Sequence, residues 1–369
     1  MSFWQGRRVL ITGHTGFKGS WLSLWLKQLG TDICGIALKP VGTPNLFDLA
    51  KVENGMRSEF ADIRDLGRLS AIMAEHRPEI VFHMAAQPLV RKSYEDPVGT
   101  YSTNVMGTVN VLEAVRHCNS VRAVVVVTTD KCYENKEWLW PYREGDALGG
   151  YDPYSNSKAC AELVVSAYGN SFFAPEKFAE HRVAVASARA GNVIGGGDWA
   201  CDRIVPDAMR AFVSNEILQV RNPAAIRPWQ HVLEPLRGYL VLAEHLIENG
   251  EQFEGAWNFG PAISDSQTVE WIIRELASSW GASASWESDT RSHPHEAKTL
   301  KLDWSKAHAL LGWKPVLPLS LALQFTADWY RRWSAGEDAR TLTMEQIEFY
   351  ATIAKDSHAK ADRAEIPSN

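Results

Sequence analysis

Two short segments of the sequence carry side chains of the kinds that transfer protons. Tyr154 and Lys158 form a Y-x-x-x-K motif at the start of an amphipathic stretch. A spacing of four places both side chains on one face of a helix. The ammonium would then stabilise the ionised phenol, and an oxidised nicotinamide would add to that effect. Such a pair also arises by chance on solvated helices, so its place in the fold decides its meaning.

The second segment, Thr128-Thr129-Asp130-Lys131, directly follows the apolar run AVVVV. In open α/β sheets, ligands bind at the carboxyl ends of the strands. A hydroxyl, a carboxylate and an amine at such an end favour chemistry over the alternative, a polar turn after a buried strand.

These side chains need a sheet to position them, and the first half of the chain predicts one. Six strand-like runs alternate with amphipathic helices: Arg8–Thr12, Ile33–Leu38, Ser58–Ile63, Glu79–Ala86, Ala123–Thr129 and Arg182–Arg189. Continuous Val/Ile runs between helices are typical of a parallel sheet that is covered on both faces. We therefore predict an α/β protein with a Rossmann-type doubly wound parallel sheet.

A glycine-rich loop lies between the first strand and the first helix. Gly13, Gly16 and Gly19 follow the spacing G-x-x-G-x-x-G, which permits a tight turn, close approach of a pyrophosphate and close helix–strand contact. This context predicts dinucleotide binding. The acidic residue that holds the adenosine ribose of NAD is missing after the second strand, and Lys39 there could meet a 2′-phosphate. On these residues alone, NAD and NADP both stay open.

The pattern loosens after Gly195, and we expect a second, smaller domain. Residues 1–194 are predicted to form the dinucleotide-binding domain, to which 232–260 return. Residues 195–231 and 261–355 are predicted to form a mixed α/β C-terminal substrate domain. We expect 356–369 to be a frayed polar tail.

Composition excludes several classes of protein. The chain has 369 residues and a net charge of −6 without a basic stripe, which argues against nucleic-acid binding. Its five cysteines are odd in number and lack Cys-x-x-Cys spacing, so neither a disulfide framework nor a zinc site is expected. His293-Pro294-His295-Glu296 offers too few ligands for a metal. No signal peptide and no apolar run of ~20 residues is visible, so we expect a cytoplasmic protein without membrane contact.

Taken together, the motifs resemble the extended short-chain dehydrogenase/reductase family. The resemblance rests on the glycine loop, Ala85-Ala86-Gln87, Thr103-Asn104, Thr129 and the Tyr154/Lys158 pair. Asp130 beside Thr129 resembles the pattern of the nucleotide-sugar 4,6-dehydratases. Epimerases of the family usually carry small residues at the positions of Asp130 and Lys131. The resemblance is strongest to the dehydratases that act on CDP-glucose. It rests on Lys131, GHTGFKGSW at 13–21, PNLF at 44–47 and GGGDW at 195–199.

The resemblance implies NAD as the cofactor, a nucleotide-sugar substrate and a homo-oligomer, either a dimer or a dimer of dimers built on the helices around 104–117 and 157–168. The implied cofactor-binding residues are Gly13, Thr15, Gly16, Phe17, Lys18, Gly19, Asp62, Ile63, Ala85, Ala86, Gln87, Asn104, Thr128, Tyr154 and Lys158. The implied substrate-binding residues are Gln87, Asn192, Arg203, Arg227, Asn258 and His295. Trp199 and Trp229 could stack on the base, although a Trp more often belongs to the core.

The implied catalytic residues are Thr129, Asp130, Lys131, Tyr154 and Lys158. Tyr154 would take the proton of the sugar 4-hydroxyl, which Thr129 holds, and Asp130 would protonate the departing C6 hydroxyl. Related dehydratases carry a glutamate base where Lys131 stands. An ammonium must lose its proton before it can act as a base. Two roles for Lys131 therefore stay open, the base at C5 or a group that only stabilises the enolate.

Three other functions compete with this interpretation. The first is a nucleotide-sugar epimerase or reductase of the same family, whose product would keep the C6 hydroxyl. The second is a non-catalytic NAD-binding sensor, although such chains usually lose the Tyr or the Lys. The third is a dehydratase that uses another nucleotide.

Overall fold

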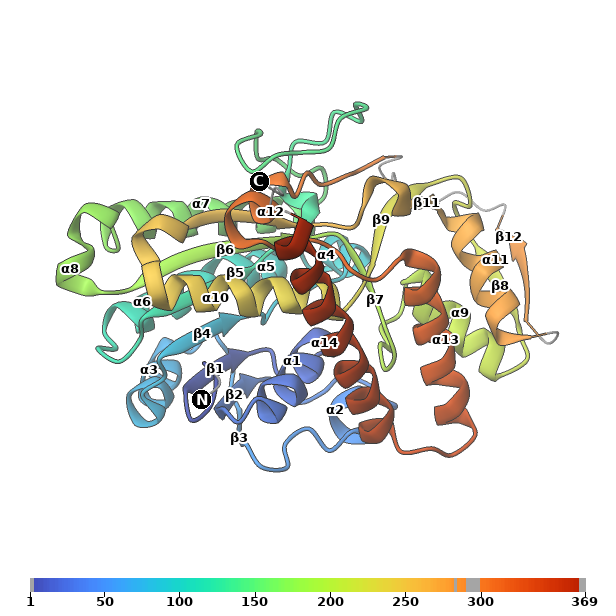
Figure 1. Cartoon of the computed structure of the whole chain (residues 1–369), viewed down its shortest axis with the longest axis horizontal. Helices are drawn as coiled ribbons and strands as arrows, with labels where there is room; N and C mark the ends of the chain where they lie inside the picture. The colour runs from blue at the N-terminus through green and yellow to red at the C-terminus, as the bar shows by residue number, and fades with distance from the viewer. Residues whose placement is uncertain (1–2, 282–283, 290–298, 365–369) are drawn as a thin grey trace.

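The centre of the computed structural model, which describes residues 3–281, 284–289 and 299–364, is a parallel sheet of seven strands (Figure 1). The strand order is β10-β6-β5-β4-β1-β2-β3. The strands are β1 (Arg8–Thr12), β2 (Asp32–Ala37), β3 (Arg57–Phe60), β4 (Ile80–His83), β5 (Ala123–Val127), β6 (Ala184–Ala190) and β10 (Gly255–Phe259). The order reverses between β1 and β4, which confirms the predicted doubly wound fold.

Helices cover both faces of this sheet. One face carries α1 (Phe17–Gln28) and α10 (Leu233–Phe253), and the other carries α3 (Leu66–His76), α6 (Gly107–Arg116) and α7 (Pro153–Ser171). Successive side chains of a strand point to opposite faces. Accordingly, Val125 packs with the α1 and α10 side chains, and its neighbour Val124 packs with those of α3 and α6.

The second part of the molecule is a smaller mixed α/β unit, seen on the right of Figure 1. In its three-stranded sheet, β9 (Ile226–His231) runs parallel to β7 (Asn192–Ile194) and antiparallel to β11 (Ser266–Thr268). Two further strands and three helices complete the unit: β8 (Ile217–Val220), β12 (Ser285–Ser288), α9 (Ile204–Val213), α11 (Val269–Trp280) and α13 (Leu319–Ser334). This confirms the predicted mixed C-terminal part.

The chain returns to the main sheet twice. Strand β10 joins it beside β6, where α12 (Ser305–Leu311) packs on it. Helix α14 (Ala339–Ala364) packs against α1 and α13. Helix α14 continues to Ala364 and so includes residues 356–364 of the stretch predicted as a polar tail. The three alanines in that stretch favour a helix even though the segment is polar.

Helix α14 is fixed to α10 by a buried polar cluster. The Tyr350 hydroxyl donates to Glu234 Oε2 at 2.8 Å, and Arg237 Nε donates to that hydroxyl at 3.0 Å. Glu234 Oε1 also accepts the backbone N–H groups of Val316 and Leu317 at 2.8 and 2.6 Å. This cluster ties the end of the chain to the helix that covers the main sheet.

The GGGDW and PNLF motifs pack together at the junction of the two parts. A side chain at Gly196 would overlap the Trp329 indole, and Gly197, with φ of 77°, lies against Leu46. Trp199 packs edge-on against Tyr330, with ring centroids 5.0 Å apart. Both motifs therefore hold the two parts of the molecule against each other.

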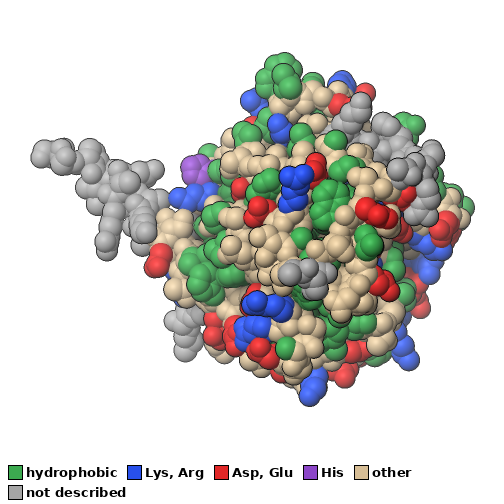
Figure 2. Space-filling model, turned by 90° about the vertical axis from the view of Figure 1, so that its right-hand side faces the viewer, with side chains coloured by type: hydrophobic (Ala, Val, Ile, Leu, Met, Phe, Trp, Pro, Cys, Tyr) green, Lys and Arg blue, Asp and Glu red, His purple; other side chains and the backbone are tan. Residues whose placement is uncertain are grey.

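The surface of the smaller part is mixed in character. On the face drawn in Figure 2, acidic and basic side chains are interspersed with apolar ones. Within the described residues, no helix is both long enough and apolar enough to cross a membrane.

Candidate functional site

The glycine loop forms a tight cradle at the carboxyl end of β1. Gly13 has φ of 81°, and a Cβ there would lie 2.7 Å from the Ala85 nitrogen. A Cβ at Gly19 would overlap the Gly13 carbonyl. Helix α1 begins after Gly16 without a side-chain cap, so its first N–H groups face outward. Such a helix start suits a pyrophosphate, and the loop therefore fits a dinucleotide.

The residues predicted near the adenosine already have partners. The Thr15 hydroxyl donates to the Leu38 carbonyl at 2.9 Å, which joins the glycine loop to the end of β2. The Asp62 carboxylate accepts the Arg64 guanidinium at 2.6 Å and the Arg64 backbone N–H at 2.9 Å. Ile63 is buried against Gly107. Contact of Asp62 and Ile63 with adenine stays a prediction.

Asn104 connects the loop after β4 to the catalytic helix. Its Oδ1 accepts the Gln87 N–H at 2.8 Å, and its Nδ2 donates to the Gln87 carbonyl at 3.1 Å and to Ser157 Oγ at 2.8 Å. Asn104 lies in a π-helical turn, η1 (Ser102–Met106), a form often found at functional sites. At the start of the same loop, the Ala85 N–H donates to Thr12 Oγ1 at 3.1 Å.

The Gln87 side chain bonds its own loop and helix α5 (Pro97–Tyr101). Its Nε2 donates to Thr100 Oγ1 at 3.0 Å and to the Leu89 carbonyl at 3.1 Å. Ala86 lies between Ala85 and Gln87 in this loop. The backbone of the loop thus has a fixed course beside the glycine cradle.

Tyr154 and Lys158 lie in the first turns of α7. The Tyr154 hydroxyl lies close enough to the Thr129 side chain to interact with it. Burial raises the pKa of Tyr154 to about 12, and the interaction with Thr129 opposes this shift. Lys158 Nζ donates to the Val127 carbonyl at 3.0 Å. Burial lowers the pKa of Lys158 to about 8, and the Glu162 carboxylate opposes this shift.

Asp130 and Lys131 begin the short 3-10 turn η2 (Asp130–Cys132) after β5. Asp130 Oδ1 accepts the Thr129 hydroxyl at 3.0 Å. Its buried Oδ2 has no hydrogen-bond partner among the described residues. Burial raises the pKa of Asp130, opposed first by the Lys131 charge. Asp130 is therefore suited to carry a proton and to donate it.

Lys18 extends from the glycine loop toward the same charges. Burial lowers its pKa to about 7, and the charges of Arg203 and Lys158 lower it further. Asp130 and Asp198 act in the opposite direction. The cradle and the proton-transfer residues therefore belong to one electrostatic site.

Of the predicted substrate residues, two arginines lie near this site. Arg203 donates to Asp198 at 2.9 Å, and the charge of Arg227, a buried residue of β9, acts on Asp130. Asn192 is half-buried at the start of β7, where it pairs with Trp229. A substrate contact by these residues stays a prediction.

Asn258 lies apart from any surface that a ligand could reach. It is fully buried, and its Nδ2 donates to the carbonyls of Tyr142 and Asp303 at 2.9 and 3.0 Å. In this structure Asn258 joins two segments through these bonds, and its contact with the nucleotide stays a prediction. His295 lies outside the described residues, as do His293 and Glu296. Among the residues that the structure does describe, no group of three His, Cys, Asp or Glu side chains could hold a metal.

Neither proposed stacking residue is free to stack. The Trp199 indole packs against Tyr330 and Trp333. Trp229 is buried, and its indole N–H donates to the Gln267 carbonyl at 3.1 Å. Both serve packing.

The sequence analysis missed a buried ion pair behind the site. Arg189 Nη2 donates to Glu162 Oε2 at 2.7 Å. The Thr128 hydroxyl, predicted to face the cofactor, donates to Glu162 instead. Two signals could have revealed the pair, since Glu162 follows Lys158 by four residues and Arg189 interrupts an apolar strand.

His83 is a buried residue at the end of β4. Its ring nitrogens bond Thr12 Oγ1 at 2.7 Å and Thr108 Oγ1 at 3.0 Å. Burial lowers its pKa to about 3, so the ring is neutral.

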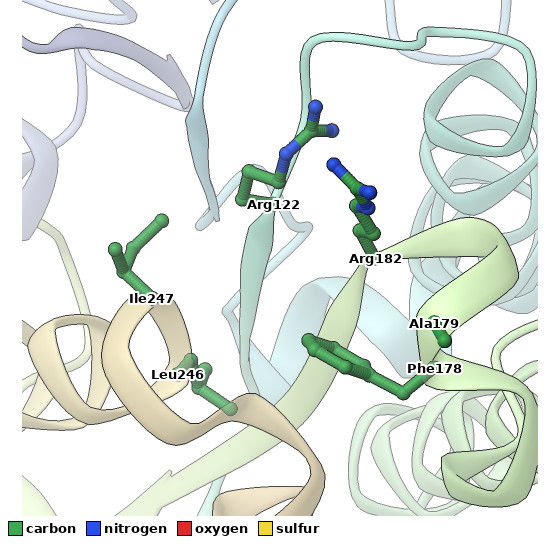
Figure 3. A pocket seen from close by; sticks show the side chains of 6 residues that line it. All are labelled: Arg122, Phe178, Ala179, Arg182, Leu246 and Ile247. Atoms are coloured by element: carbon green, nitrogen blue, oxygen red, sulfur yellow. The ribbon is translucent and has the colours of Figure 1, made fainter.

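A groove lies at the opposite edge of the main sheet. Figure 3 shows Arg122 and Arg182 pointing toward each other beside Phe178 and the α10 residues Leu246 and Ile247. Because Arg122 and Arg182 precede β5 and β6, the groove is at the amino ends of these strands. It contains none of the predicted site residues.

Comparison with known proteins places these residues among nucleotide-sugar enzymes. Residues 10–324 match a family model described as GDP-mannose 4,6 dehydratase. The chain is 54% identical over 349 residues to the CDP-glucose 4,6-dehydratase of Salmonella typhimurium, which covers 95% of this chain and 97% of the relative.

Solved structures share the fold. A UDP-glucose 4-epimerase from Brucella ovis in complex with NAD has a TM-score of 0.76 and 24% identity, over 88% of this chain and 99% of that one. DesIV, a dTDP-glucose 4,6-dehydratase from Streptomyces venezuelae with NAD and TYD bound, has a TM-score of 0.73 and 25% identity, over 88% and 97%.

The cradle makes a direct prediction about cofactor binding. Gly19→Ala should weaken NAD binding at least tenfold, because the added methyl overlaps the Gly13 carbonyl and displaces the loop. Calorimetric titration with NAD measures this, and circular dichroism checks the fold. Gly145→Ala is the matched control, since a Cβ at that position meets no atom within 4 Å. Equal affinity in the two variants would contradict the prediction.

Proposed function

Because the chain belongs to the nucleotide-sugar 4,6-dehydratase family, we propose that it converts CDP-glucose to CDP-4-dehydro-6-deoxyglucose and water, with NAD as its cofactor. The observation that carries the choice of substrate is the 54% identity to a CDP-glucose 4,6-dehydratase over 95% of the chain. The glycine cradle and the outward N–H groups of α1 support NAD binding. When bound, NAD supplies an acceptor for the hydride from C4 and returns that hydride to C6.

Tyr154 removes the proton from the sugar 4-hydroxyl. The Thr129 side chain interacts with Tyr154, so its hydroxyl lies where it can hold the sugar oxygen beside the phenol. The Lys158 ammonium, on the same helix, stabilises the tyrosinate that must form. Together, these three side chains remove the hydroxyl proton that must leave when C4 is oxidised.

Asp130 supplies the proton for loss of the C6 hydroxyl. Burial favours its protonated form, and its Oδ2 has no hydrogen-bond partner among the described residues. The Thr129 hydroxyl holds the other oxygen, Oδ1, which fixes the direction of Oδ2. A positioned acid of this kind is what the elimination of water requires and what an epimerase does not need.

Lys131 removes the proton at C5. It adjoins Asp130 in η2, so acid and base lie next to each other as the adjacent carbons C5 and C6 do.

The alternative function, a nucleotide-sugar epimerase, is supported by the similarity of this fold to epimerase structures. The epimerase structure is 24% identical, and its fold is common to epimerases and dehydratases. The non-catalytic alternative is disfavoured because Tyr154 and Lys158 are both present and both lie at the site.

We also propose that the chain acts as a cytoplasmic homo-oligomer. All five cysteines are unpaired, as is usual in a reducing compartment. Exposed apolar side chains gather on α5 (Pro97–Tyr101), the adjoining η1 and the neighbouring α7, which pack together: Val98, Tyr101, Met106, Leu163 and Phe172. An apolar face of this kind suits a second copy of the chain.

A panel of nucleotide sugars tests the reaction. Incubated with CDP-, dTDP-, UDP- or GDP-glucose and no added reductant, the protein should remove one water from CDP-glucose at least a hundred times faster than from the others. Mass spectrometry detects the loss of water. A product of unchanged mass with an inverted centre would indicate an epimerase. Dehydration of one of the other nucleotide sugars, but not of CDP-glucose, would overturn the assignment of the cytidine nucleotide.

Exchange at C5 tests the role of Lys131. In Lys131→Met, incorporation of solvent deuterium at C5 of CDP-glucose should fall at least a hundredfold, because the base is gone while NAD still oxidises C4. Transient absorbance of reduced NAD confirms the C4 step. Tyr154→Phe is the control, since it should block both the absorbance change and the exchange. Exchange at the wild-type rate in Lys131→Met would leave only the enolate-stabilising role.

Sedimentation tests the proposed interface. Leu163→Arg should shift the protein from dimer toward monomer, because a guanidinium would be buried in the apolar contact between two copies. Leu310→Arg, at a similarly exposed leucine on α12, should leave the assembly unchanged. A dimer that persists in Leu163→Arg would place the interface elsewhere.

A further inference from the structure

A buried ion pair lies directly behind the catalytic residues. Glu162 of α7 and Arg189 of β6 are 4% and 3% exposed, and their charged groups are 2.7 Å apart. The Glu162 carboxylate also accepts the hydroxyls of Thr128 and of Ser187, the latter at 2.7 Å. Every bond to this carboxylate thus comes from a strand of the main sheet or from the residue that ends it.

The pair reaches the catalytic residues through α7. Glu162 lies one helical turn after Lys158, on the same face of the helix. Its charge favours the Lys158 ammonium and opposes the effect of burial. The same carboxylate accepts the hydroxyl of Thr128, which directly precedes Thr129 in the chain.

On its other side, the pair is anchored by the segment between η2 and α7 and, through it, by strand β10 of the main sheet. Arg189 Nη1 donates to the Tyr133 hydroxyl at 2.7 Å and to the Glu144 carbonyl at 3.1 Å. The Tyr133 hydroxyl donates to Asn258 Oδ1 at 2.7 Å. Arg189 therefore has a fixed position, and Glu162 is fixed through it.

Stability alone is a weak reason for such a pair. Removing two charges from water is costly, and apolar side chains of similar size often stabilise a core as well or better. Because the Glu162 carboxylate lies one helical turn from Lys158, the pair points to a role in the chemistry of Lys158.

We propose that Glu162 is a positioning residue that acts through Lys158. Held by Arg189, Thr128 and Ser187, its carboxylate keeps the Lys158 side chain charged beside Tyr154 while the sugar is oxidised. This inference rests on the proposed function, in which Tyr154 takes the proton of the 4-hydroxyl.

The other titratable groups around Lys158 do not replace Glu162. His83 interacts with Lys158 but is neutral, and burial raises the pKa of the Cys132 thiol, which stays protonated. Lys18 bears the same sign of charge and opposes the ammonium. Of these groups, Glu162 is the one whose negative charge stabilises the Lys158 ammonium.

The test is the pH dependence of kcat in Glu162→Gln. Burial lowers the pKa of Lys158, and without Glu162 this pKa falls below its present value of about 8. The ammonium is then lost at lower pH, so turnover declines at lower pH than in the wild type. If the pKa of Lys158 falls by about one unit, the ratio of wild-type to variant kcat should be about fivefold larger at pH 8 than at pH 6, because the wild-type lysine is itself half deprotonated at pH 8.

Two further variants separate charge from structure. Ser187→Ala removes one hydrogen bond to the same carboxylate and no charge, so its pH profile should match the wild type. Glu162→Asp keeps the charge and should return the profile toward the wild type. Thermal unfolding and NAD titration show whether each variant is folded and loaded with cofactor.

A loss of turnover that is equal at all pH values in folded Glu162→Gln would overturn the proposal and leave only a structural role. An NMR titration of isotope-labelled lysine, with the Lys158 signal assigned by its loss in Lys158→Met, reads the same ionisation without turnover. If the wild type dehydrates no nucleotide sugar, the proposed function fails. If Glu162→Gln leaves the Lys158 titration unchanged, the inference about Glu162 fails.

Discussion

Burial of ionisable groups at the carboxyl edge of the main sheet is the constraint on which the site depends. Burial is the largest cause of the pKa shifts of Tyr154, Lys158 and Asp130, and in each case it favours the neutral form. Neutral forms suit an acid such as Asp130, but the tyrosine needs help to ionise. The charged neighbours therefore decide which groups can work, and Glu162 is the neighbour of Lys158.

The fold delivers these groups from distant parts of the chain to one edge. Strand β5 ends between β4 and β6, so the turn after it lies near the loops that follow both neighbours. Asn104 and Thr12 then fix the loop after β4 through bonds to its backbone N–H groups. Because these bonds involve backbone atoms, the geometry of the loop depends little on the side chains that it carries.

Local patterns in the sequence predicted the main sheet, the glycine loop and the Tyr154/Lys158 pair, because each depends on neighbours within a few residues. The buried bonds of Asn258 and of Glu162 could not be predicted in this way. Their partners, Tyr142 and Arg189, are remote in sequence, and only tertiary packing brings them together.

The turn η2 explains how two adjacent residues can serve as acid and base. A 3-10 helix has three residues per turn, so consecutive side chains point in directions ~120° apart. Asp130 is turned into the buried side of the site, where Thr129 holds it, while Lys131 stays partly exposed. Proton donation at C6 and removal at C5 require two such directions from nearly one point.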